Sequence, residues 1–269
     1  MSKSKKSRKI TLDLLLSATS LTRSSTESSD AYLQRVTHLH LQGKKIKVIE
    51  GLDLCTNIKV LYLYDNLIEV IQNLENQAII QYLHLQNNLI TEMPDLPMSS
   101  LTKLYLDANE ISEVRGLHNC TKLEELHLGN QRLSSSVSLS FDPMSLNAIS
   151  KSLQVLEISG NGISILKPFG VLNNLRKLFC ASNEVSDVEE IEYIVGLSHL
   201  QEAVFIDNPC CRVKNYRDYA IGAASDSLLI LDSIPVLRHQ QVAIRGIMAH
   251  RKKLMAKKLK QSDMNDRME

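Results

Sequence analysis

Apolar residues recur along this chain in a nine-residue frame, whose first, fourth and sixth places are mostly leucine and whose ninth is mostly asparagine. Successive copies of the frame start 22, 22, 21, 22, 30, 22 and 25 residues apart. A period of about 20–29 residues is typical of a chain that stacks one short strand and one turn per repeat. The pattern therefore predicts a solenoid, with repeats that start at Val36, Ile58, Ile80, Leu101, Leu123, Leu153, Leu175 and Leu200.

The places of the frame have separate physical roles. Alternate strand residues face opposite sides, so the apolar fourth and sixth places should point into the core. The asparagine amide can satisfy backbone groups that a buried turn leaves unpaired, and we expect a ladder of such amides that Lys44 and Gln131 interrupt. The predicted fold class is an α/β solenoid: a leucine-rich-repeat horseshoe of about eight repeats, with a parallel concave sheet and short convex helices or turns. The predicted ladder comprises Asn66, Asn88, Asn109, Asn161, Asn183 and Asn208.

The repeats divide the chain into four predicted parts. Residues 1–30 form a basic, Ser/Thr-rich segment in which Leu12, Leu15 and Leu16 suggest a short capping helix. Residues 31–208 hold the repeats, and residues 209–244 resemble the C-terminal cap that follows leucine-rich repeats of this length. Residues 245–269 read as a basic helix or tail. An open solenoid needs such caps because its end repeats would otherwise expose the core.

The concave surface is the candidate binding site, because the third, fifth and seventh places of each frame should project from the sheet. Aromatic residues make up only 4% of the chain, yet tyrosines and histidines gather at these places. Such residues suit protein interfaces, although aromatic side chains also favour strands for packing reasons alone. The candidate protein-binding residues are His38, His40, Tyr62, Tyr64, Tyr82, His84, Tyr105, Asp107, Glu125, His127, Glu157, Phe179 and Glu202.

The sequence favours neither a metal site nor an enzyme. His40, His84 and His127 fall on every second strand, so they should lie about 10 Å apart and cannot share one ion. The five cysteines occupy mostly core places and lack paired zinc spacing. No Ser/His/Asp set or Gly-rich phosphate loop stands out. We therefore expect no catalytic residue, no metal and no cofactor.

The step between the fifth and sixth repeats is longer than the others. Its added chain ends in Asp142 and Pro143, which suit the N-cap and first turn of a helix. The insertion is either a tolerated convex loop or a second contact site.

Charge separates the ends of the chain from its middle. Residues 1–30 carry six Lys and Arg against three acids, and residues 245–269 carry eight against three. With a total of +1, the middle is therefore about 1 − 3 − 5 = −7. An acidic body argues against direct nucleic-acid binding by the repeats, whereas the basic tails could attract acidic tubulin tails, nucleic acid or a membrane surface. No apolar run suggests a membrane span and residues 1–30 lack a secretory pattern, so we expect a soluble intracellular chain.

Five segments carry a more specific resemblance: residues 61–66 (LYLYDN), 130–133 (NQRL), 141–143 (FDP), 150–153 (SKSL) and 216–218 (YRD). With the repeats and cap, over residues 33–240, the chain resembles leucine-rich-repeat regulators of protein phosphatase 1, and in particular the regulatory subunit 42 family of testis leucine-rich-repeat proteins. The resemblance implies binding to the phosphatase 1 catalytic subunit and to tubulin, in the cytoplasm and cytoskeleton at the centrosome or microtubule-organising centre.

The resemblance leaves alternatives open. Short phosphatase-docking motifs end in Phe or Trp, whereas residues 9–12 (KITL) and 35–38 (RVTH) do not, so the concave face is the expected contact. A cytoskeletal or ciliary adaptor that binds tubulin without phosphatase, and an RNA-associated leucine-rich-repeat adaptor, are the other predicted classes. All three are non-catalytic scaffolds without a small-molecule substrate.

Overall fold

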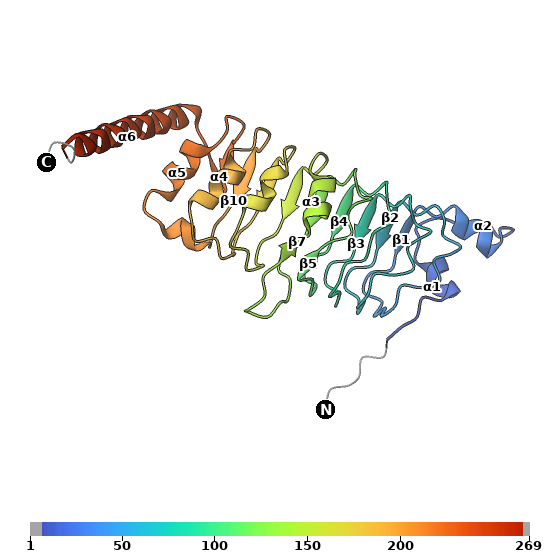
Figure 1. The fold of residues 1–269 in the computed structure, drawn as a ribbon. Coiled ribbons are helices and arrows are strands. Elements are labelled where there is room, and N and C mark those ends of the chain that lie inside the picture. The colour runs from blue at the N-terminus through green and yellow to red at the C-terminus, as the bar shows by residue number, and fades with distance from the viewer. Residues whose placement is uncertain (1–6, 266–269) are drawn as a thin grey trace.

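A parallel sheet runs the length of the molecule, with one strand for each predicted repeat (Figure 1). The structure is a computed structural model that describes residues 7–265. Each repeat strand begins at the third place of its frame and ends at the fifth, and neighbouring strands pair in register. The predicted solenoid is confirmed. Its strands are β1 (His38–His40), β2 (Val60–Tyr62), β3 (Tyr82–His84), β4 (Lys103–Tyr105), β6 (Glu125–His127), β8 (Val155–Glu157), β9 (Lys177–Phe179) and β10 (Glu202–Val204).

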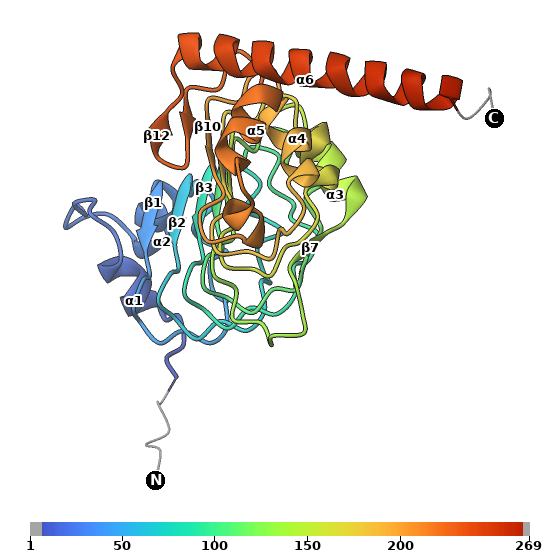
Figure 2. The ribbon, with the colours of Figure 1, turned by 90° about the vertical axis from the view of Figure 1, so that its left-hand side faces the viewer.

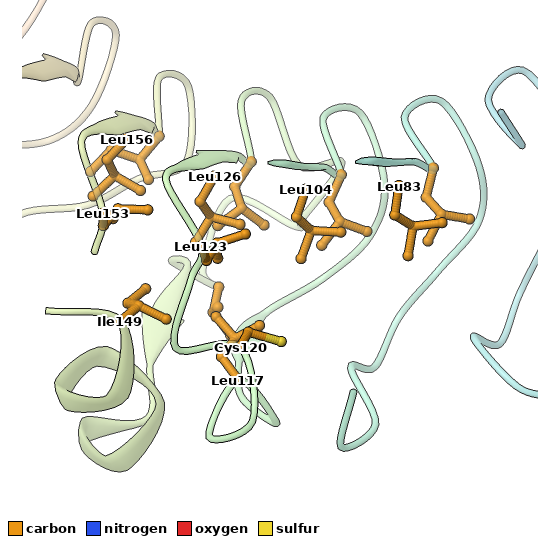
Figure 3. Close-up of a cluster of buried hydrophobic side chains, with 14 of the residues drawn as sticks. Leu83, Leu104, Leu117, Cys120, Leu123, Leu126, Ile149, Leu153 and Leu156 are labelled. Atoms are coloured by element: carbon orange, nitrogen blue, oxygen red, sulfur yellow. The ribbon is translucent and has the colours of Figure 1, made fainter. Parts of the chain in front are cut away.

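The core is a set of apolar columns behind this sheet. Leu83, Leu104, Leu126 and Leu156 occupy the fourth place of four consecutive strands, and all four are fully buried. Figure 3 shows them side by side along the stack. Because each repeat buries its apolar places against its two neighbours, stability comes from the stacking of repeats rather than from any single repeat.

The chain leaves each strand through a left-handed turn at the eighth place of the frame. Backbone φ is positive there in every repeat, for example 57° at Asp65 and 68° at Gly160. Most of these places carry Gly, Asn or Asp, which tolerate this region best. Ala108 and Ser182 are exceptions, with φ of 52° and 53°. The sharp turn brings the ninth residue back under the sheet.

The ninth-place amides are buried and bond to two turns at once. Asn88 Nδ2 donates to the carbonyls of Leu63 and Leu85 at 3.0 and 2.9 Å, and its Oδ1 accepts from the Ile68 N–H at 3.0 Å. The structure corrects one expectation, because Gln131 does not interrupt the series. Its Nε2 donates to the Leu106 and Leu128 carbonyls and its Oε1 accepts from Ile111 N–H. Lys44 only donates its backbone N–H to Asn66.

The convex side carries short elements that become helical toward the C-terminus. The long repeat forms β7 (Ser140–Phe141), which pairs in parallel with β5 (Glu113–Val114) of the preceding repeat. As predicted, Asp142 caps α3 (Pro143–Ile149) by accepting from the Ser145 N–H at 2.9 Å. The following convex elements are η1 (Lys167–Val171) and α4 (Glu189–Val195).

Two short helices close the N-terminal end, α1 (Leu12–Ser17) and α2 (Ser29–Gln34). The predicted stripe on α1 is partly confirmed, since Leu15 is buried and Leu16 packs against the core, but Leu12 is 47% exposed and Leu14 is buried in its place. A six-residue helix shows too few turns for its periodicity to fix the buried face. The second helix was not predicted, and it buries Tyr32, whose hydroxyl donates to the Leu21 carbonyl.

The C-terminal cap contains η2 (Pro209–Arg212), α5 (Tyr216–Ala223), β11 (Ile230–Leu231) and β12 (Ile234–Pro235). Strand β11 continues the parallel sheet, and β12 folds back antiparallel to it. Helix α6 (Arg238–Asn265) starts inside the predicted cap and runs on past the predicted boundary at 244/245, so cap and tail share one helix. Figure 2 shows α6 crossing the end of the solenoid and extending beyond it. Between residues 7 and 265, no helix is long and apolar enough to cross a bilayer.

Candidate functional site on the concave face

The three outward places of the strands form the candidate surface, here called the concave face. Its predicted residues come from all eight repeat strands, and most are half-buried, whereas His38 and Tyr82 are exposed. Val60, a third-place residue expected to project from the sheet, is only 4% exposed. Parallel pairing in register aligns equal places of neighbouring strands, for example His40 with Tyr62. Side chains that are far apart in sequence therefore form columns across the face.

The fifth-place column is a continuous stack of five aromatic rings. Histidine and tyrosine alternate, and the centroid separations are 4.7, 4.8, 4.4 and 4.6 Å. These separations match the spacing of about 4.8 Å between strands, so the backbone register itself sets the stack. The stack comprises His40, Tyr62, His84, Tyr105 and His127.

Tyr62 also meets a second tyrosine. The ring of Tyr64, at the seventh place, lies edge-on to it with centroids 6.4 Å apart. A T-shaped pair of this kind adds to the attraction between rings. The two tyrosines therefore form a broad aromatic area at the N-terminal half of the face.

Burial lowers the pKa of His84, with further contributions from the charges of His127 and Lys103. The neutral imidazole is therefore favoured inside the stack. This fits the parallel stacking of His84 on Tyr105, whose ring planes differ by only 5°.

The third-place column is ionic in its middle. Lys103 Nζ lies 2.8 Å from Glu125 Oε1 and 5.5 Å from the centroid of the Tyr82 ring. The hydrogen bond to Glu125 raises the pKa of Lys103. Burial raises the pKa of Glu125, but the hydrogen bond and the charge of Lys103 outweigh burial, so the net pKa is lowered. Both groups are therefore charged at neutral pH.

The same carboxylate ties the two columns together. The Tyr105 hydroxyl donates to Glu125 Oε2 at 3.3 Å. Burial, followed by the charge of Glu125, raises the pKa of Tyr105. The phenol is therefore held as a hydrogen-bond donor at neutral pH.

Two carboxylates flank an open place beside the stack. Gly129 occupies the seventh place, and a Cβ built on it would lie 3.1 Å from Asp107 Oδ1 and 3.2 Å from Glu157 Oε1. Asp107 accepts from the Gly129 N–H at 2.8 Å, and Glu157 accepts from the Ser159 N–H at 2.7 Å. Burial raises the pKa of both carboxyls despite these bonds.

The other predicted residues lie outside this centre. Glu202 pairs with Lys177 at 3.0 Å, and Phe179 is half-buried on β9. The exposed ring of His38 has its Nδ1 2.9 Å from the Thr37 hydroxyl. The structure thus gathers the repeat strands β1, β2, β3, β4, β6 and β8 into one connected polar and aromatic surface, with a weaker extension on β9 and β10.

Sequence reasoning missed three contributors to this surface. Lys103 and Lys177 each pair with a third-place glutamate one repeat further on, and the sequence separation of one repeat was a usable signal. The third is Gly129, at a seventh place, where the Cβ of any other residue would lie between Asp107 and Glu157.

Most cysteines in the described part of the chain lie in the core, whereas a hydrogen bond with Cys210 lowers the pKa of the half-buried Cys211 to about 7. Among residues 7–265, no group of three or more His, Cys, Asp or Glu side chains is arranged to hold a metal ion. All five cysteines are free, and four are fully buried. Burial raises the pKa of Cys55 to about 11 and that of Cys120 to about 12, so these thiols are packing groups.

Comparison with known proteins agrees with this architecture. Residues 99–140 match the family described as leucine rich repeats, in two copies. The crystal structure of internalin C2 from Listeria monocytogenes superposes with a TM-score of 0.60 at 24% identity, over 76% of this chain and 88% of that one. The chain has the leucine-rich-repeat fold. A leucine-rich-repeat protein of Leptospira interrogans gives a TM-score of 0.58 at 24% identity, over 79% of this chain and 53% of that one.

One curated relative matches a short segment of the chain. A 66-residue segment is 33% identical to the human cilia- and flagella-associated protein 410, which covers 24% of this chain and 26% of that protein. The leucine-rich-repeat chain thus matches about a quarter of this relative's length. The likeness leaves most of both proteins unmatched.

Proposed function

We propose that this leucine-rich-repeat protein is a non-catalytic scaffold that holds a folded protein partner against its concave face. The observation that carries the proposal is the stack of five rings from His40 to His127, with Tyr64 and Tyr82 beside it. Large side chains held by their neighbours lose little entropy when a partner contacts them. Their polar atoms and the adjacent carboxylates can form hydrogen bonds that orient such a partner.

The partner we propose first is the catalytic subunit of protein phosphatase 1. The support is the resemblance carried by residues 61–66 and 141–143, together with the mixed aromatic and acidic character of the face. In this proposal the chain acts as a regulatory subunit in the cytoskeleton, at the centrosome or other microtubule-organising centre.

The second candidate is a ciliary or cytoskeletal adaptor that binds tubulin without the phosphatase. The likeness of a 66-residue segment to the human cilia- and flagella-associated protein 410 favours it. In that case the same concave face binds a cytoskeletal protein. An RNA-associated adaptor gains no support from the surface described above, where acids and aromatics rather than a broad basic patch face outward.

Isothermal titration calorimetry with purified phosphatase 1 catalytic subunit tests the first candidate. The test variant is Tyr62→Ala/Tyr105→Ala/Phe179→Ala, which shortens three concave side chains. The matched control is Val70→Ala/Met144→Ala/Ile165→Ala, which removes three exposed apolar side chains elsewhere. Circular dichroism checks that each variant is folded.

We expect the wild type and the control to bind and the concave variant to lose at least about tenfold in affinity, the effect of roughly 1.4 kcal/mol. Equal binding by all three would contradict the concave site. If the wild type does not bind the phosphatase, the same three chains titrated with tubulin decide between the two candidates.

A further inference from the structure

A second surface lies at the edge of the sheet where the strands of the C-terminal repeats begin. It is a groove of about 510 Å³, separate from the ring stack. Its lining includes Lys122, Lys151, Arg176 and His199, which precede or open the frames of the fifth to eighth repeats. Thr102 and Glu124 also line it.

The groove concentrates positive charge on a body that is otherwise acidic. Lys122, Lys151 and Arg176 contribute three cations against the single carboxylate of Glu124, whereas residues 31–244 together carry about −7. On the concave face, Lys103 and Lys177 are neutralised by Glu125 and Glu202. The positive groove is thus a local reversal of the charge of the body.

The charged groups of the three cations are free to meet a ligand. Among the side chains that the structure describes, none forms an ion pair with Lys122, Lys151 or Arg176 or a hydrogen bond with their charged groups, and all three residues are exposed. Exposed cations without neutralising neighbours raise the local concentration of anions. They are available to pair with a ligand without first breaking an internal contact.

His199 adds a fixed polar group at one end of the groove. Its Nδ1 lies 2.9 Å from the Asn173 carbonyl oxygen. A carbonyl oxygen can only accept, so Nδ1 carries the proton and donates in this contact. Its Nε2 is then the nitrogen left to contact a ligand.

The groove has the length of a short extended peptide. The cations precede β6, β8 and β9, and His199 precedes β10, and these four strands are consecutive in the sheet. At about 4.8 Å per strand, they span roughly 14 Å, which corresponds to about four residues of an extended chain at roughly 3.3 Å each. A single free anion would leave most of this length empty.

We propose that this groove, the basic groove, binds an extended acidic peptide segment of a partner protein. Asp or Glu side chains of the segment pair with Lys122, Lys151 and Arg176, and its backbone N–H groups donate to Glu124. A nucleic-acid strand fits less well, because its phosphates cannot donate to Glu124 and the lining includes no Tyr, Phe or Trp on which bases could stack.

Fluorescence anisotropy of a fluorescein-labelled hexaglutamate peptide, titrated with the full chain at low salt, tests the proposal. The test variant is Lys122→Gln/Lys151→Gln/Arg176→Gln. The matched control, Lys45→Gln/Lys59→Gln/Lys214→Gln, removes the same charge from exposed positions elsewhere on the body. A third variant, Lys252→Gln/Lys257→Gln/Lys258→Gln, reports on the C-terminal basic residues.

We expect the groove variant to weaken peptide binding about tenfold, as the loss of three modest surface contacts implies, and the other two variants to change it less than about threefold. An equal loss in the matched control would show general charge attraction and overturn the proposal. Loss in the third variant with none in the groove variant would also overturn it. The proposal would likewise be overturned if an oligouridylate displaced the labelled peptide at a lower concentration than unlabelled hexaglutamate does.

This proposal and the concave-face proposal can fail independently. The variant Tyr62→Ala/Tyr105→Ala/Phe179→Ala should bind the hexaglutamate peptide like the wild type, since none of its substituted residues lines the basic groove. If that folded variant loses the peptide, the peptide binds at the concave face and the groove assignment is wrong.

Discussion

The carboxylate of Asp107 accepts a hydrogen bond of 2.8 Å from the backbone N–H of Gly129, on the strand-side turn of the next repeat. Glu157 lies on the other side of the same glycine. Among the described residues, no Lys or Arg forms an ion pair with either carboxylate. The charge of His127 partly offsets the two carboxylates, but two partly buried negative charges that no Lys or Arg pairs with cost stability, and a partner cation would relieve that cost.

Neutralising this pair should therefore stabilise the free protein. Burial raises the pKa of both carboxyls, so the folded state binds their protons more tightly than the unfolded state does. The stability that protonation contributes is complete below the unfolded pKa of about 4 and is lost as pH rises through the folded value. We expect Asp107→Asn/Glu157→Gln to raise the free energy of unfolding at pH 7 by on the order of 1 kcal/mol.

The gain should disappear toward pH 4, where the wild-type carboxyls are themselves protonated. Urea denaturation of both proteins at pH 7 and pH 4, followed by circular dichroism, measures the two differences. A gain of the same size at both pH values would rule out charge as its cause.

A glycine substitution at one of the left-handed turns should stabilise the protein. Ala108 has φ of 52°, a region that costs an L-residue with a Cβ about 1 kcal/mol or more. Glycine relieves this strain but loses more backbone entropy on folding than alanine does. The net effect of Ala108→Gly should be a gain of about 0.5 kcal/mol in the free energy of unfolding. Ala148→Gly, inside helix α3, should destabilise by about 0.5–1 kcal/mol. Thermal unfolding of the two variants should move in opposite directions, and loss of stability in both would refute the turn argument.

Gln131 should matter as much as an asparagine of the ladder. Gln131→Ala leaves the N–H of Ile111 without an acceptor, whereas the carbonyls of Leu106 and Leu128 each keep one amide donor, from Asn109 and Asn161. A buried group left unsatisfied costs about 1–3 kcal/mol, so we expect a loss of about 1–3 kcal/mol in chemical denaturation. Asn109→Ala provides the reference, and a Gln131 effect under about 1 kcal/mol would mean that its bonds contribute little.

Two glycines with similar backbone angles should respond very differently to substitution. Gly43 and Gly116 have φ of 66° and 73°. A Cβ on Gly43 meets nothing within 4 Å, but one on Gly116 would come within 2.1 Å of the Pro94 carbonyl oxygen. Gly43→Ala should lower the free energy of unfolding by about 1–2 kcal/mol through backbone strain alone. Gly116→Ala should lower it further, because the added Cβ also collides with the Pro94 carbonyl. Equal melting temperatures for the two variants would show that the chain around Pro94 moves aside easily.

The repeat frame predicted the body of the fold well because each of its places has one physical task. All eight strands begin at the expected third place, even across the long step from His127 to Val155. The extra residues of that step lie on the convex side, so the register of the sheet is unchanged. The frame could not show that Gln131, one methylene longer than asparagine, still reaches the same backbone groups.

The candidate site was predictable in position but not in its contacts. The sequence places His84 and Tyr105 in one column, whereas their parallel stacking depends on side-chain torsions that no frame specifies. The basic groove escaped notice because Lys122, Lys151 and Arg176 occupy different places of their frames. Only the folded chain brings such places to one edge.

Both ends of the sheet are sealed against further strands. At the first strand, the backbone N–H of His40 donates to the Ala18 carbonyl at 2.7 Å, so the N-terminal segment occupies that border. At the last, β12 runs in the opposite direction and contains Pro235, which has no N–H to offer a neighbour. A stack of identical registers would otherwise be a template on which a second molecule could continue the ladder. Because both edges are covered in this way, the number of strands in the sheet is fixed by the repeats of the chain itself.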